Sequence, residues 1–571
     1  MKALFPYLKP FRKQLIIGPL CKWIEAILEL ILPTIMAFMI NQGVMKHDQG
    51  VVFTYGIIML VMVFIGFGFS LICQYNAAIA SQGFGTNMRN LLFERMMHFA
   101  YEDLDQFNHS TLFIRISNDV NQLQLAVAML IRLVIRSPFI VIGAIIMAML
   151  LDFKLSLILI ASVPLITIVL ILYIKYTTPL YQTYQRKLDR FLNILEQNLS
   201  GVRVIRSFLS QRKENARLDE AAMELQAQMI RVSRLSALLN PITALIINGA
   251  IIILLWNGIL SLPDAIPAGT LIAFINYATQ ILLALVAVSN LIVIFTKAQA
   301  SAERVNELLA ISIKEENGHL TTIKDPDTAI QCEHMTFTYA NAAHPSLYDV
   351  TLSIQAGQNI GIIGGTGSGK STLAAVWMSL YNCSDFYLFG RHPMEYEKQF
   401  RQSLIALVPQ NSELFSGTLR ENLLLNDLSV DDETLWKALE DAQAAEFIYQ
   451  KGKGLEIPIE AGGKNLSGGQ RQRIAIARGL LRNAKITIFD DSFSALDFET
   501  DAKVRSALKQ YRNMTAIIIS QRVATLYQCD QILVLDNGKV VGFDTHQALY
   551  DSCNVYREIC VSQHFGREGA V

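Results

Sequence analysis

Six apolar stretches in the first half of the chain constrain the fold more than any other feature. They lie near residues 15–40, 55–79, 125–151, 155–174, 235–260 and 271–295. A helix needs roughly 20 apolar residues to cross the hydrocarbon core of a bilayer, and each stretch supplies about that length. Only the first and third contain charged residues: Lys22, Glu25, Glu29, Arg132 and Arg136. The first half is therefore expected to span a membrane six times.

Basic residues in the connections predict the orientation of these spans. The long connections 81–124 and 177–234 hold three and ten Lys or Arg residues, whereas the short connections opposite hold only Lys46 and Lys154. Cytoplasmic loops carry the excess of positive charge, so both termini are expected in the cytoplasm. The start MKALFPYLKPFRKQ lacks the pattern of a cleavable signal peptide and fits an amphipathic helix on the inner membrane surface. We expect a multi-pass protein of the plasma membrane.

Composition excludes several other classes of protein. Hydrophobic residues make up 52% of the chain and charged residues 17%, too apolar for a disordered protein. The seven cysteines are odd in number and form no C-x-x-C pair, which argues against a disulfide framework or a zinc site. A basic run at 203–217 adjoins membrane helices, so positive-inside topology explains it better than nucleic-acid binding.

The pattern changes near residue 314, where short β-branched strands begin to alternate with helices, as in QNIGIIG and KITIFD. This alternation is typical of a parallel α/β sheet. The sequence thus predicts an all-α membrane domain with six helices at 1–310, a polar linker at 311–328 and an α/β domain at 329–571. The long connections lack breakers, so the membrane helices are expected to continue into the cytosol.

A phosphate-binding loop is the strongest chemical motif. GGTGSGKS fits G-x-x-x-x-G-K-[ST] and directly follows the apolar strand 360–363. The glycines allow backbone N–H groups to surround phosphates, Lys370 reaches the β- and γ-phosphates, and the Ser371 hydroxyl is a Mg²⁺ ligand. The predicted nucleotide contacts here are Gly364, Thr366, Gly367, Ser368, Gly369, Lys370, Ser371 and Thr372.

A buried strand ending in a carboxylate supplies the second nucleotide element. Residues 486–490 read ITIFD, and Asp490 follows Lys370 by 120 residues. A carboxylate at the end of such a strand can hold Mg²⁺ next to the phosphates. The two motifs together predict an ATP site that uses Mg²⁺, so residues 329–571 are expected to be an α/β P-loop nucleotide-binding domain.

The segment LSGGQRQR, 20 residues before Asp490, is the signature of ATP-binding cassette (ABC) proteins, and the chain resembles a half-size exporter of that family with the type IV fold. The resemblance implies that Tyr339 stacks on adenine and that Gln410 lies in the glutamine loop as a ligand of Mg²⁺, with Ser371 and Asp490. It also implies that the first cytoplasmic coupling segment contains RISNDV, at 115–120. The signature residues that bind nucleotide are Ser467, Gly468, Gly469 and Gln470.

Two positions depart from the active family pattern. Asp491 stands where an active cassette has the glutamate that polarises the attacking water, and Gln521 stands where it has the switch histidine. Aspartate is one methylene shorter, and a general base must come within about 2.6–3.2 Å of its proton donor. An amide can bond a phosphate but cannot supply a protonated imidazole. Asp491, Gln521 and Gln410 are therefore the candidate catalytic positions of a slow site.

Both departures together resemble the impaired subunit of a heterodimeric exporter. The resemblance implies a partner half-transporter with the catalytic glutamate and switch histidine, whose site this chain's intact LSGGQ completes. The expected substrates are amphipathic drugs or lipid-like molecules taken from the cytoplasm or inner leaflet. An ATP-gated channel, a regulatory membrane protein, and a lipid or peptide exporter remain alternatives. Glu25 and Glu29 either face a cavity and attract cations or pair with neighbouring polar groups, and we favour the second.

Overall fold

The computed structural model describes residues 2–570 except 108, 261–266, 314–317, 341, 426–429, 512 and 568. The chain divides into two compact units. The first contains residues 1–97 and 108–312, and the second contains residues 98–107 and 313–571. Part of the expected linker, 314–317, and the short connection 261–266 lie outside the described residues.

The first unit is helical, and the prediction of six membrane-spanning helices is confirmed. The apolar helices that are long enough to cross a bilayer run Ala3–Val44, Gln49–Met97, Ser110–Leu151, Phe153–Ser200, Gln211–Asn257 and Ala268–Ala310. The helical segments of this unit are η1 (Lys2–Phe11), α1 (Arg12–Phe38), η2 (Met39–Val44), α2 (Gln49–Met97), α4 (His109–Ile114), η3 (Arg115–Asp119), α5 (Val120–Met129), η4 (Leu130–Val134), α6 (Arg136–Leu151), α7 (Phe153–Ser200), α8 (Val202–Ser207), α9 (Gln211–Leu260) and α10 (Ala268–Ala310). Helices satisfy every backbone polar group internally, which the bilayer requires.

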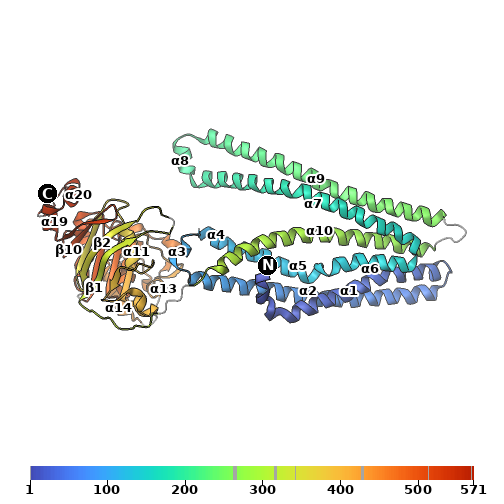
Figure 1. Ribbon diagram of the computed structural model, residues 1–571, viewed down its shortest axis with the longest axis horizontal. Helices are drawn as coiled ribbons and strands as arrows, with labels where there is room; N and C mark the ends of the chain where they lie inside the picture. Colours follow the sequence, from blue (N-terminus) through green and yellow to red (C-terminus); the bar gives the residue numbers. More distant parts are fainter. Residues whose placement is uncertain are drawn as a thin grey trace. The chain divides into compact units, whose positions relative to one another are not determined.

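Helices α7 and α9 form a long antiparallel pair joined by the short α8 (Figure 1). At the opposite end of α7 a single residue makes the turn from α6: Asp152 is extended, and its side chain accepts a hydrogen bond from the Leu155 N–H at 2.9 Å. This N-cap satisfies a donor that the helix itself leaves free. The tight turn and the long pair agree with the short outer and long cytoplasmic connections expected from the sequence.

Small and aromatic side chains close the contacts between α1, α6 and α10. Ala26, Ala144 and Ala148 are fully buried, as small residues are at close helix crossings in membranes. Tyr277 of α10 is also fully buried, and its hydroxyl donates to the Leu30 carbonyl at 2.8 Å and lies 2.7 Å from Thr34 Oγ1. The core of the unit thus fixes α10 against α1.

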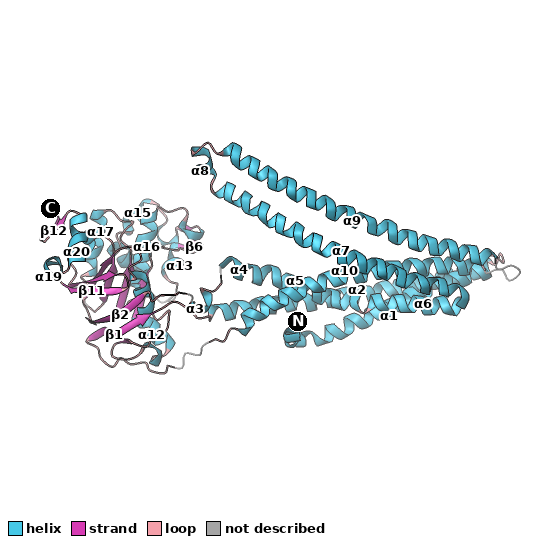
Figure 2. Ribbon diagram, turned by 45° about the horizontal axis from the view of Figure 1, so that its top comes forward, coloured by secondary structure: helices cyan, strands magenta, loops and turns pink. Residues whose placement is uncertain are grey.

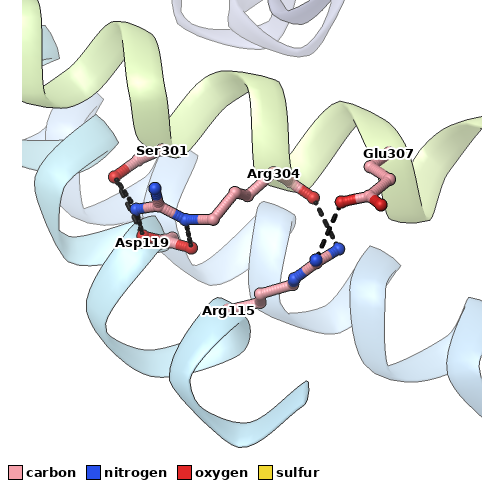
Figure 3. Close-up of polar contacts among 5 residues, drawn as sticks. All are labelled: Arg115, Asp119, Ser301, Arg304 and Glu307. Atoms are coloured by element: carbon pink, nitrogen blue, oxygen red, sulfur yellow. Dashed lines mark hydrogen bonds and ion pairs between the residues drawn. The ribbon is translucent and has the colours of Figure 1, made fainter. Parts of the chain in front are cut away.

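A polar cluster joins α10 to the η3 segment of the third span (Figure 3). The Asp119 carboxylate is fully buried and accepts hydrogen bonds from Arg304 Nε at 2.8 Å and Ser301 Oγ at 2.9 Å. Arg115 Nη2 lies 2.8 Å from the Glu307 carboxylate, and Arg115 Nη1 donates to the Arg304 carbonyl. RISNDV therefore ties two helices of the membrane unit together, which differs from the coupling role expected from the sequence.

A piece of the first cytoplasmic connection belongs instead to the second unit. Residues 98–107, which include α3 (Tyr101–Leu104), group with residues 313–571. The Tyr381 hydroxyl donates to Asp105 Oδ2 at 2.6 Å, and the Tyr101 and Tyr381 rings lie 6.4 Å apart. The sequence placed the coupling segment at 115–120, which is too late. Aromatic and acidic side chains at 101–105 make the contacts with the second unit.

The second unit is an α/β fold built on a six-stranded sheet, with helices around its strands (Figure 2). The strand order is β11-β10-β3-β9-β8-β5, all parallel except β11. A three-stranded antiparallel sheet has the order β2-β1-β4. The strands of these sheets are β1 (Thr328–Phe337), β2 (Leu347–Gln355), β3 (Asn359–Gly364), β4 (Phe386–Leu388), β5 (Ile405–Val408), β8 (Ile486–Asp490), β9 (Thr515–Ile519), β10 (Gln531–Asp536) and β11 (Lys539–Asp544).

Alternate residues of the central strands fill two cores, one on each face of the sheet. Ile486 and Ile488 of β8 face the core that includes β1 and β2, whereas Phe489 faces the core of the surrounding helices. The helices of this second core are α13 (Leu419–Leu423), α14 (Asp432–Asp441), α15 (Ala445–Gln450), α16 (Gly468–Leu481), α17 (Phe498–Leu508), α18 (Val523–Leu526), α19 (His546–Ser552) and α20 (Asn554–Ser562). Helices α11 (Lys370–Trp377) and α12 (Lys398–Leu404) pack instead in the core that includes β1 and β2. Ligands of open parallel sheets bind at the carboxyl ends of the strands, so a ligand site is expected at the ends of β3, β8 and β9.

Candidate functional site

The loop between β3 and α11 adopts the conformation that its glycines predict. Gly367 and Gly369 have φ values of 80° and 99°, which side chains disfavour. A Cβ on Gly364 would lie 2.2 Å from the Leu535 carbonyl oxygen. Lys370 Nζ donates to the carbonyls of Gly364 and Gly365 at 2.9 and 2.7 Å, and burial lowers the pKa of its ammonium. The result is a cationic loop at a helix N-terminus, which is an anion-binding arrangement.

A cavity of about 550 Å³ opens beside this loop. It brings together ten of the sequence-predicted site residues: Thr366, Gly367, Gly369, Lys370, Ser371, Thr372, Gln410, Asp490, Asp491 and Gln521. Residues 120 and 150 positions apart meet because β3, β8 and β9 are neighbours in the sheet. Gly364, Ser368, Tyr339 and the signature residues 467–470 are absent from its described lining.

Ser371 and Asp490 offer oxygen ligands at the carboxyl end of β8. Ser371 Oγ lies 3.3 Å from Asp490 Oδ1. Burial raises the pKa of Asp490, the neighbouring Asp491 carboxylate raises it further, and the Ser371 hydroxyl and Lys370 partly oppose the shift. A divalent cation here would compensate the cost of burying this carboxylate. The hydroxyl and carboxylate oxygens fit Mg²⁺, which prefers oxygen ligands and retains several waters.

Asp491 and Gln521 lie at the same end of the cavity but are held differently. Asp491 has a φ of 47°, its N–H donates to the Ile519 carbonyl at 3.0 Å, and its carboxylate accepts from Gln410 Nε2 at 3.2 Å. For Gln521, the recorded hydrogen bond among the described residues is to its backbone carbonyl, from Gln563 Nε2 at 2.7 Å. The two departures from the active pattern therefore both border the cavity.

Tyr339 adjoins the cavity from a cluster of aromatic rings. Its hydroxyl donates to Thr372 Oγ1 at 3.2 Å, and its ring lies 5.0 Å from Phe337 and 5.2 Å from Tyr381. The contact with Thr372, which lines the cavity, places Tyr339 at its edge. This position suits stacking on a flat base.

Sequence reasoning missed six lining residues: Pro345, Ser346, Ile519, Ser520, Asn537 and Gly538. Asn537 and Gly538 both have positive φ and form the tight turn between β10 and β11. The Gly538 N–H donates to the Ser368 carbonyl at 3.1 Å, which supports the phosphate loop. An Asn-Gly pair between two apolar runs signals a hairpin, but its position at the cavity depends on β10 lying beside β3.

The signature begins α16 with a complete capping box. Ser467 Oγ accepts from the Gln470 N–H at 3.2 Å, and Gln470 Oε1 accepts from the Ser467 N–H at 3.0 Å. In the following turn, Gln472 pairs with Ser412 and fixes the loop that carries Gln410. The signature thus forms a helix N-terminus that is not part of the described lining of the cavity in its own chain.

Family models match both parts of the chain. Residues 15–285 match the family model of the ABC transporter transmembrane region, and residues 347–494 match the ABC transporter model. An uncharacterized ABC transporter ATP-binding protein of Mycobacterium tuberculosis is 34% identical, over 98% of this chain and 97% of that protein. The chain is an ABC transporter.

Two further comparisons match this transporter over nearly its whole length. An ATP-dependent lipid A-core flippase of Photorhabdus laumondii is 27% identical over 97% of the transporter and 96% of the flippase. A bacterial Atm1-family ABC exporter with ATP bound has the same fold, with a TM-score of 0.79, 20% identity, and coverage of 97% of this chain and 99% of the other. The transporter is thus a multi-pass membrane protein whose nucleotide-binding domain is cytoplasmic. Its family membership implies ATP binding.

Proposed function

We propose that this transporter is one subunit of a heterodimeric exporter, and that its own phosphate-loop site hydrolyses ATP slowly. The observation that carries the proposal is the presence of both Asp491 and Gln521 at the cavity. Asp490 and Asp491 are the only carboxylates in the described lining, and no histidine is among these residues. Asp490 is the cation ligand in this scheme, so Asp491 is the one remaining candidate base.

The geometry of Asp491 supports slow hydrolysis. Its backbone is fixed by the bond to Ile519, and its carboxylate is fixed by Gln410. A glutamate at this position would extend one methylene further towards an attacking water, and general-base efficiency depends steeply on that reach. Mg²⁺, held by Ser371, Gln410 and Asp490, would neutralise charge on the phosphates. ATP binding is thus expected to persist while cleavage is slow.

Exposed apolar side chains on the α7–α9 pair support association with a second subunit. Phe208 and Leu209, beside α8, are 77% and 83% exposed, and Met223 on the cytoplasmic part of α9 is 63% exposed. A groove of about 430 Å³ between α7 and α9 is lined mainly by apolar groups, including Phe191, Leu225 and Met229. Apolar surface of this kind marks interaction sites when it lies in water.

The signature of this chain is expected to complete the partner's site. Its helix N-terminus and Ser467 do not serve the described cavity of their own chain, so their phosphate-binding capacity is available to a partner that carries the catalytic glutamate and switch histidine. Closure of the two cassettes around ATP would switch the membrane domains to an outward-facing state. Hydrolysis at the partner's phosphate loop would return them to the inward-facing state.

Amphipathic or lipid-like substrates are expected, and the charged residues of the first and third spans supply no preference for cations. Lys22 Nζ lies 2.7 Å from Glu25 Oε1, and Arg136 Nη2 lies 2.7 Å from Glu29 Oε2. Both carboxylates are neutralised by basic partners, as the structural alternative for Glu25 and Glu29 requires. The similarity to a lipid A-core flippase further supports a lipid-like substrate for this chain.

The decisive comparison for the proposed function is between the chain alone and the chain with its partner. The purified homodimer is expected to bind ATP but turn it over very slowly, whereas co-expression with a half-transporter that has the glutamate and histidine restores turnover. Robust turnover by a verified homodimer, lost in Lys370→Ala, would remove the case for a slow site. ATP-dependent substrate accumulation in inside-out vesicles distinguishes an exporter from an ATP-gated channel, which would show passive current.

A further inference from the structure

Gln563, the residue that follows α20, holds the loop that carries Gln521 from both sides. Its Nε2 donates to the Gln521 carbonyl at 2.7 Å, and its Oε1 accepts from the Val523 N–H at 2.8 Å. One planar amide therefore fixes two backbone groups, one on each side of Arg522. The signature, phosphate-loop and carboxylate motifs contain no residue with this role.

The C-terminal helices provide a rigid base for Gln563. Tyr556 of α20 is fully buried, and its hydroxyl lies 2.8 Å from Nδ1 of the buried His546 in α19. Phe565, two residues after Gln563, packs its ring 5.1 Å from that of Tyr527, which directly follows α18. Since packed aromatic cores resist displacement, the position of Gln563 is set by the core of the second unit.

The position of Gln521 depends on its main chain. Within the described residues no side-chain hydrogen bond of Gln521 is recorded, although Gln521 borders the cavity. The next residue, Arg522, donates to the carbonyls of Ser494 and Leu496, so it is fixed to the loop after β8. Gln563 supplies the opposing attachment, and together the two attachments determine where the Gln521 side chain lies.

We propose that Gln563 is a positioning residue for the part of the ATP site that contacts the γ-phosphate. Tyr339 and the phosphate loop are expected to hold the base and the phosphates that ATP and ADP share. Gln521 lines the cavity with Asp490 and Asp491, where the terminal phosphate of ATP would lie. Loss of the Gln563 amide thus weakens ATP binding selectively. The proposal rests on ATP binding in this cavity and not on the heterodimer, because homodimer and heterodimer both contain this loop.

The test measures affinity of the full-length transporter for ADP and for a non-hydrolysable imido analogue of ATP, both with Mg²⁺. Gln563→Ala removes both hydrogen bonds, and Gln563→Met removes them while keeping the length of the side chain. Each variant is expected to weaken analogue binding about 3- to 10-fold and to leave ADP binding within about twofold. Gln563→Glu, which places a carboxylate against the Gln521 carbonyl, is expected to match or exceed this loss.

Gln547→Ala, at an exposed glutamine of α19, is the matched control and is expected to leave both affinities unchanged. Lys370→Ala is expected to weaken both ligands. An unchanged ratio of the two affinities in Gln563→Met, or an equal loss for both ligands with a lowered melting temperature, would show that Gln563 only stabilises the C-terminal helices. If the Gln563→Ala chain does not fold, the Gln563→Met ratio decides the question. Fast turnover by the homodimer would overturn the slow-site proposal while leaving this ratio interpretable.

Discussion

The side-chain amide of Gln410 donates a hydrogen bond to the Asp491 carboxylate across 3.2 Å. This bond joins the loop after β5 to the end of β8, and it engages the one carboxylate that stands at the position of the catalytic base. The Asp491 carboxylate is therefore directed towards Gln410, and its side chain is one methylene shorter than the glutamate that would reach an attacking water. The short side chain and its bond to Gln410 explain why aspartate in place of glutamate is expected to slow ATP hydrolysis.

Restoring the family residues is expected to create an active homodimer. Asp491→Glu with Gln521→His lengthens the base and supplies an imidazole, and general-base contributions of ~100-fold or more are typical. The steady-state ATPase rate of the purified double variant is expected to rise by at least ~100-fold over that of the wild-type homodimer. Adding Lys370→Ala should abolish the gain. A double variant as slow as the wild type would place the cause of slow turnover elsewhere.

The buried Asp119 carboxylate predicts unequal effects for two neighbouring residues of α10. Arg304→Ala leaves a fully buried charge with Ser301 as its remaining recorded donor, and loss of a buried partner costs about 3–5 kcal/mol. Glu307→Ala removes the ion-pair partner of Arg115, which is also buried but keeps its hydrogen bond to the Arg304 carbonyl, so a smaller loss of about 1–3 kcal/mol is expected. Thermal unfolding in detergent should therefore shift more for Arg304→Ala. Equal shifts would contradict this ranking.

Paired charges in the membrane unit predict no selectivity for cations. Replacing Glu25 and Glu29 by glutamine leaves Lys22 and Arg136 without their partners, so transport of cationic and of neutral substrates is expected to fall by similar factors. Uptake of a matched cationic and neutral pair into inside-out vesicles measures both. A loss confined to the cation would instead show that these carboxylates face the substrate.

The bond between Tyr381 and the 98–107 segment is expected to couple substrate binding to ATP hydrolysis, and Tyr381 is not expected to contribute to nucleotide binding. Tyr381→Phe keeps the ring against Tyr339 but removes the bond to Asp105, so ATP affinity should stay within about twofold while substrate stimulation of ATPase falls. Burial, and next the bond to Asp105, raises the pKa of Tyr381. The stabilisation is thus present below the ordinary tyrosine pKa of about 10 and is lost only as pH rises through the higher folded value. The difference in thermal stability between the wild type and Tyr381→Phe should therefore be the same at pH ~7 and at pH ~9.

The local motifs could be predicted from sequence because each carries its own geometry. A glycine loop between a strand and a helix, and a carboxylate at a strand end, specify their conformations within a few residues, as Lys370 and Asp490 illustrate. The six spans follow from length and hydropathy alone. RISNDV was assigned wrongly because its charged residues fit either a contact with the cassette or a contact between helices, and only the packing of Asp119 against α10 distinguishes them.

The role of Gln563 had no local signal. Its two partners, at 521 and 523, lie about 40 residues earlier, and the contact exists because α20 packs against α19 and β10, in the same core as Val523 of α18. The Asn537-Gly538 turn is an intermediate case. Its conformation is readable from the two residues, whereas its place at the cavity follows from the order of β10 and β3.

The most direct test of the central claim compares two variants of this chain in the same heterodimer with one wild-type partner. Ser467→Arg disrupts the signature that serves the partner's site, where loss of preorganised donors costs ~100-fold or more in rate. Asp491→Ala alters a site that already turns over slowly, so steady-state ATPase activity should change only modestly. The account requires the heterodimer nearly to stop with Ser467→Arg and to continue with Asp491→Ala. The opposite ranking would show that this chain's own phosphate-loop site is the main hydrolytic one.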